Sequence, residues 1–104
     1  MKALITFNYE GNTYSIRTTE HSEERMEERN ITALQVLSAV TALTMDELDK
    51  LRDENKDLAI IDENEGYAVI ICRDKNTIKV ITVIDEADIW VKDGTNTKRL
   101  KGDE

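Results

Sequence analysis

The single histidine of this chain, His21, lies in a charged stretch with two arginines at helical spacing. Arg25 follows four residues later and Arg29 four residues after that, so a helix would place the three side chains within about 80° of arc. An imidazole transfers protons near neutral pH, and guanidinium groups stabilise negative charge that develops on a phosphate. The combination is typical of metal-independent phosphodiester cleavage, which requires no cofactor.

The five glutamates among residues 20–29 support a second interpretation, in which they pair with the arginines on a solvated surface. Met26 is the only apolar side chain inside this helix. A helix that packs must therefore turn Met26, Ser22 and the aliphatic stem of Arg25 or Arg29 inward. One or both guanidinium groups would then approach the rest of the domain. The spacing by itself leaves both interpretations open.

A family resemblance is carried by the pattern H-x-x-x-R-M-x-x-R-N-I-T at residues 21–32. It resembles the signature of a small bacterial domain family of unknown function, family 4258, with Asn30 at the usual glycine position. Residues 77–83 resemble that family's penultimate strand, so the likeness covers residues 16–85. It implies a fold similar to the RelE-like and barnase-like superfamily of ribonuclease toxins, often encoded on plasmids and phages. In those proteins, the open face of a curved antiparallel sheet receives the RNA.

The resemblance also implies roles for particular residues. His21 would act as the general acid or base, and Arg25 and Arg29 would be phosphate-binding or structural residues. Thr82 would lie on the sheet near them. No metal and no other cofactor is implied. Two further residues of the expected sheet are candidates for substrate binding: Arg73 and Lys79.

The charge of the chain departs from that of ribonuclease toxins, which are usually basic. The formal net charge is −8, and residues 45–66 alone contain nine acids against three bases. RNA binding requires clustered lysines and arginines, so a basic surface would have to act against the field of the whole chain. Ser22 and Glu23 also replace the small apolar residues that usually follow the histidine.

Three functions therefore stay open. The first is a RelE-like ribonuclease of a mobile element or phage that acts on RNA. The second is an inactive member of the same fold that binds a protein partner, such as an antitoxin or a basic protein, through the acidic helix and loop at residues 45–66. The third is a homodimer without chemistry, formed through strands that are apolar on both faces.

The elements that must position these residues follow from periodicity. Alternating apolar residues predict two strands, at residues 3–9 and 13–18, joined by a turn at residues 10–12. Capping residues predict helices from Thr19 or Ser22 to about Arg29, from Thr32, and from Thr44 to about residue 55. In the second helix the positions expected to face inward are Leu34, Leu37, Val40 and Leu43, flanked by Val36 and Ala39.

The second half of the chain changes to β-branched runs, at residues 58–62, 67–73 and 77–85. The last two runs are apolar on both faces, which predicts central strands. Residues 88–91 are a candidate edge strand. The whole indicates one α+β domain at residues 1–92, with an N-terminal hairpin and two to three helices packed on a curved antiparallel sheet. Residues 93–104 are expected to form a polar tail.

Other classes of function fit less well. Residues 53–64 begin like a calcium loop, but Leu58 and Asn64 occupy positions that need glycine and glutamate. One cysteine cannot form an internal disulfide and suits a reducing compartment. No apolar run approaches the roughly 20 residues of a membrane helix, and the first residues do not resemble a signal peptide. We therefore expect a cytoplasmic protein that does not contact a membrane.

Overall fold

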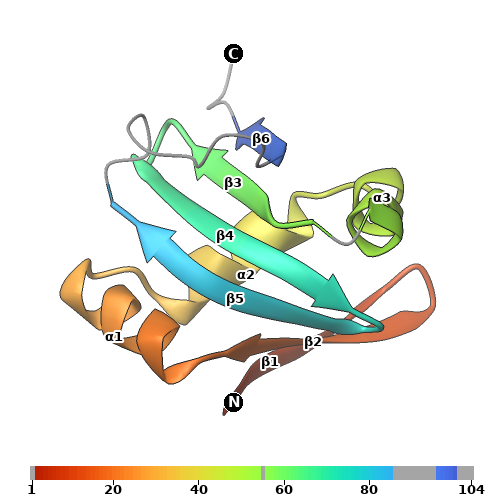
Figure 1. The fold of residues 1–104 in the computed structure, drawn as a ribbon, viewed down its shortest axis with the longest axis horizontal. Coiled ribbons are helices and arrows are strands. Elements are labelled where there is room, and N and C mark those ends of the chain that lie inside the picture. Colours follow the sequence, from red (N-terminus) through yellow and green to blue (C-terminus); the bar gives the residue numbers. More distant parts are fainter. Residues whose placement is uncertain (1, 55, 86–95, 101–104) are drawn as a thin grey trace.

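The computed structural model describes residues 2–54, 56–85 and 96–100, and Figure 1 shows their arrangement. The α+β class is confirmed: a hairpin is followed by helices and then by a meander. The strands are β1 (Lys2–Tyr9), β2 (Asn12–Thr18), β3 (Leu58–Asp62), β4 (Tyr67–Asp74), β5 (Thr77–Ile84) and β6 (Asn96–Leu100). The helices are α1 (Glu20–Glu28), α2 (Ala33–Thr41) and α3 (Met45–Glu54).

The strands form one sheet in the order β1-β2-β5-β4-β3-β6, so β4 and β5 are central, as their two apolar faces predicted. The expectation of a purely antiparallel sheet is wrong at two places, because β2–β5 and β3–β6 are parallel. Neither pair is consecutive in the chain. No tight turn therefore fixes their direction, and a long connection permits parallel pairing.

The C-terminal part of the sequence differs from the expected polar tail. Residues 96–100 form β6, which pairs with β3 in register Ile60↔Lys98, and Leu100 packs against the main core. Backbone hydrogen bonds to the buried strand β3 hold residues 96–100 in place despite their polar composition. The candidate edge strand at residues 88–91 lies outside the described residues.

Helix boundaries follow the capping residues of the sequence. Thr19 caps α1: its hydroxyl accepts from the Ser22 amide at 3.0 Å, and the Ser22 hydroxyl accepts from the Thr19 amide at 2.8 Å. Asn30, with φ of +55°, adopts the left-handed conformation expected after the helix. The capping boxes predicted at Thr32 and Thr44 are both confirmed.

The helices cover one face of the sheet, and Figure 1 shows α2 crossing behind β4 and β5. In α2 the buried residues are Val36, Ala39 and Val40, whereas Leu34 is 73% exposed. The prediction that Leu34 points inward is therefore wrong. At about 100° per residue, Leu34 lies on the side of α2 opposite Val36 and Ala39, so the helix cannot bury all three against the same sheet.

The two faces of the sheet have different character. The face toward the helices contains the main core, including Ile16, Ile78 and Val80. On the other face, Ile61 and Ala68 form a small apolar cluster with Ile84 at one end. At the other end of this face, the residues of β2, β5 and β4 that alternate with the core residues are mostly polar. We call this region the open face, and it comprises Ser15, Arg17, Cys72, Asp74, Thr77 and Lys79.

Candidate functional site

The side chains of helix α1 form three stripes along its length: one buried, one with the histidine and the arginines, and one acidic. Ser22 and Met26 are buried and attach the helix to the core, as the lone methionine predicted. Next to them lie His21, Arg25 and Arg29, which share one side of the helix as the spacing required. The third stripe consists of glutamates. The histidine and the arginines therefore lie between the buried side and an acidic side.

Arg25 within α1 and Arg29, which caps its C-terminal end, are both engaged within the chain. Arg25 forms an ion pair with Glu28 at 2.6 Å, and its side chain is 34% exposed. Arg29 donates to the carbonyl oxygen of Val83 and lies 3.4 Å from an oxygen of Asp85. Strand β2 pairs with β5 only as far as Val80, so Arg29 reaches a part of β5 that β2 does not cover. Arg29 thus ties the end of α1 to the sheet.

His21 is exposed and makes no hydrogen bond or ion pair with a described residue. The glutamate stripe beside it comprises Glu20, Glu24 and Glu27, at spacing i, i+4 and i+7. These three carboxylates are exposed and form no ion pair within the described residues. The surroundings of His21 are consequently acidic, which does not favour approach of a phosphate backbone.

The structure does not bring Thr82 and Lys79 together with α1. Thr82 pairs with Ile70, one position from the core pair Val69↔Val83, and therefore faces away from the helices. Lys79 alternates with the core residues and lies on the open face. The expected cluster of His21 and its arginines with Thr82 is thus divided between two sides of the sheet.

Arg73 also differs from its expected position. It lies on the helix-covered face, with a side chain only 3% exposed. Its Nη1 donates to the Leu48 carbonyl oxygen at 2.8 Å, and its Nε donates to the Lys75 carbonyl oxygen at 2.6 Å. The guanidinium carbon also lies 5.1 Å from the centre of the Tyr14 ring. Arg73 and Lys79 therefore do not share a surface, because adjacent rungs of the ladder face opposite sides.

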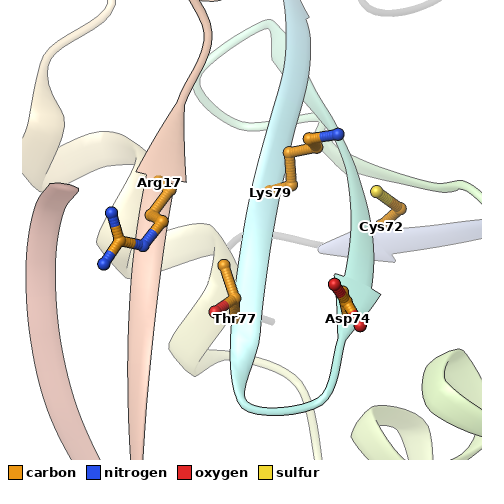
Figure 2. A pocket seen from close by; sticks show the side chains of 5 residues that line it. All are labelled: Arg17, Cys72, Asp74, Thr77 and Lys79. Atoms are coloured by element: carbon orange, nitrogen blue, oxygen red, sulfur yellow. The ribbon is translucent and has the colours of Figure 1, made fainter. Parts of the chain in front are cut away.

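The open face carries a pocket of about 250 Å³. Strand register arranges its lining in two rows. One row runs Arg17, Lys79, Cys72 across β2, β5 and β4, and the next places Thr77 beside Asp74. Figure 2 shows the Arg17 guanidinium and the Lys79 ammonium directed away from each other, with the ammonium toward β4. Two cations thus occupy neighbouring strands on one face.

Arg17 and Lys79 form no ion pair with a described residue. The other five arginines are all engaged by carboxylate or carbonyl oxygens: Arg25, Arg29, Arg52, Arg73 and Arg99. Sequence reasoning missed Arg17, although the inward alternation of Tyr14 and Ile16 already placed it on the opposite side of its strand. What the sequence could not supply was the parallel pairing of β2 with β5, which puts Arg17 beside Lys79.

The chemistry of this pocket is that of binding. Burial raises the pKa of the Cys72 thiol, although the charge of Lys79 acts in the opposite direction, so the protonated thiol is favoured at neutral pH. Within the described ranges no group of three or more His, Cys, Asp and Glu residues is placed to hold a metal ion. The pocket therefore offers two cations, a hydroxyl and a carboxylate, but no activated nucleophile.

The fold and surfaces define an α+β domain with helices on one face of a mixed sheet and a polar pocket on the other. Comparison with protein-family models, with curated proteins and with solved structures finds no match. Among the described residues, no helix has the length and apolar character that crossing a membrane requires.

Proposed function

We propose that this chain is a non-catalytic binding module of the RelE-like class that engages a basic partner through the acidic side of α1. The observation that carries the proposal is the stripe of Glu20, Glu24 and Glu27, which is exposed and has no ion pair within the described residues. The arginines beside it are occupied internally. A helix with one unneutralised acidic side presents a surface complementary to lysines or arginines of a partner.

Catalysis by the His–Arg stripe has less support. A phosphate bound beside His21 would have to displace Glu28 from Arg25, and would gain nothing from Arg29 without detaching α1 from β5. Thr82, the fourth expected member of that site, faces the other side of the sheet. The net charge of −8 further opposes RNA binding.

The test of the binding function is the triple variant Glu20→Gln, Glu24→Gln, Glu27→Gln. We expect its affinity for an arginine-rich peptide to fall about tenfold, because three favourable charge interactions are removed. Fluorescence anisotropy at increasing salt measures the effect, and the wild-type affinity should fall with salt. The matched control neutralises three exposed acids elsewhere: Glu10→Gln, Asp57→Asn and Glu65→Gln.

The control variant carries the same net charge as the α1 variant, so only location distinguishes the two. We expect it to bind the peptide within about twofold of the wild type. Equal weakening in both variants would mean that total charge, and not α1, attracts the peptide. That result would contradict the proposal.

A ribonuclease is the second candidate, and the exposed imidazole of His21 favours it. The binding proposal predicts that purified wild-type protein leaves single-stranded RNA intact and that His21→Ala behaves identically. A gel-based cleavage assay in the absence of metal ions compares the two proteins. Cleavage by the wild type that is lost in His21→Ala would restore the catalytic interpretation.

A further inference from the structure

We propose that the pocket on the open face binds a small phosphate monoester that carries hydroxyl groups, of the sugar-phosphate type. This inference does not rest on the acidic side of α1, since the pocket lies on the sheet face away from the helices. Its starting point is the pair Arg17 and Lys79, held side by side by the register of β2 and β5. Like charges in such positions repel and reduce stability unless an anion neutralises them.

The charges of the pocket select the anion. Two adjacent cations match the double negative charge of a phosphate monoester better than the single charge of a carboxylate. The planar guanidinium of Arg17 can bind two phosphate oxygens, and the ammonium of Lys79 supplies a mobile point charge. Both side chains are long enough to turn from the positions in Figure 2 toward an anion placed between β2 and β5.

The second row of the pocket, Thr77 and Asp74, determines which chemical group can be attached to the phosphate. Asp74 is exposed at this end of the pocket and makes no side-chain hydrogen bond or ion pair with a described residue. Its carboxylate repels a second anionic group and accepts hydrogen bonds from hydroxyl groups. Thr77 beside it both donates and accepts. A neutral polyol next to the phosphate therefore fits this row, whereas a dicarboxylate or a polyphosphate does not.

Size and composition favour a small ligand over a nucleic acid. The pocket volume of about 250 Å³ lies below the roughly 300–1,000 Å³ common for ligand sites. None of the five lining residues is aromatic, so bases of a single strand would have no ring to stack on here. The net charge of −8 repels a long polyanion along its whole length, while a small dianion experiences chiefly the local field.

Ribose 5-phosphate is the probe for the test, titrated into isotope-labelled full-length protein and followed by NMR. We expect chemical-shift changes centred on the amides of Arg17, Thr77 and Lys79, with a dissociation constant on the order of 1 mM. Lys79→Gln and Arg17→Gln should each weaken binding about tenfold, because each removes a charge-assisted hydrogen bond. The matched control is Lys56→Gln, which removes an exposed lysine outside the pocket and should bind as the wild type does.

Two further measurements complete the test. Lys79→Gln should unfold at the same temperature as the wild type or higher, because a like-charge contact is relieved, so lost binding cannot reflect lost structure. Asp74→Ala should bind ribose 5-phosphate and inorganic phosphate with equal affinity, because the acceptor that distinguishes a hydroxylated ligand is gone.

Three results would overturn the proposal. One is the absence of shifts at the pocket in the wild type. The second is equal weakening by Lys56→Gln, which would indicate a non-specific charge effect. The third is much tighter binding of a 5′-phosphorylated RNA oligonucleotide at the same amides, which would identify a nucleic-acid surface.

Discussion

Replacing Arg73 by methionine is expected to lower the free energy of unfolding by about 3 kcal/mol. Methionine retains an apolar stem of similar length, so the change removes the guanidinium without opening a large cavity. The carbonyl oxygens of Leu48 and Lys75 then lose a charged donor. The contact with the face of Tyr14 is lost as well.

The size of this effect follows from the position of Arg73 between the sheet and α3. Its side chain is 3% exposed, so water cannot replace the donor at the carbonyl oxygen of Leu48. Among the residues that the structure describes, the carboxylate paired with Arg73 is that of Asp49, whose oxygen is 3.8 Å away and whose side chain is 43% exposed. Carbonyl oxygens and the Tyr14 ring, rather than a close ion pair, therefore hold the charge. Without the guanidinium of Arg73, α3 would lose this hydrogen bond to β4.

Arg52→Met is the matched control, because this arginine lies on α3, the helix that Arg73 contacts, and its side chain is 51% exposed. It pairs with Asp53 at 3.0 Å and with Asp49 at 3.7 Å, both through water-accessible atoms. We expect a loss below about 0.5 kcal/mol for this variant. Urea unfolding of both variants measures the difference. A loss under about 1 kcal/mol for Arg73→Met would show that the guanidinium does not hold α3 to the sheet.

Local patterns in the sequence predicted the elements because those elements are determined locally. The hairpin turn at Glu10 and Gly11, the capping box at Thr32 and the left-handed residue Asn30 all act within a few residues. The two apolar faces of β4 and β5 also identified central strands without knowledge of their neighbours. These features account for the confirmed α+β class.

The site was harder to predict because it depends on which strands become neighbours. Arg73 and Lys79 both lie on strands, and alternation assigns each to one face only when register is known. Strand β5 contains a bulge between Val80, the partner of Ile71, and Thr82, the partner of Ile70. This bulge shifts the alternation of faces before Thr82. Arg17 meets Lys79 through a parallel pairing that joins segments about sixty residues apart. Periodicity within one segment contains no information on such contacts.

Between about pH 10 and pH 12, the protein is expected to lose about 2 kcal/mol of stability through Tyr67 alone. Burial raises the pKa of this phenol to about 12, and the charges of Asp62 and Glu65 add to the effect. The side chain is only 4% exposed, and its hydroxyl donates to the carbonyl oxygen of Gln35 at 3.0 Å. The folded state therefore retains the proton, whereas the unfolded chain releases it near pH 10.

The sign of the effect follows from proton linkage. Above the pKa of the unfolded tyrosine, the unfolded state binds fewer protons than the folded state, so stability falls as pH rises. The contribution is fully present below about pH 10 and is lost as the pH rises through the folded value near 12. Other groups titrate in the same range, so a variant that removes only this phenol is needed.

Tyr67→Phe provides that comparison. Near neutral pH it should be less stable than the wild type by about 1 kcal/mol, because the hydrogen bond between α2 and β4 is lost. Its stability should then fall less steeply above about pH 10, so the two curves converge and cross before about pH 12. Urea unfolding across this range decides the matter: a constant difference between wild type and Tyr67→Phe would mean that the buried phenol releases its proton as easily in the folded state as in the unfolded chain.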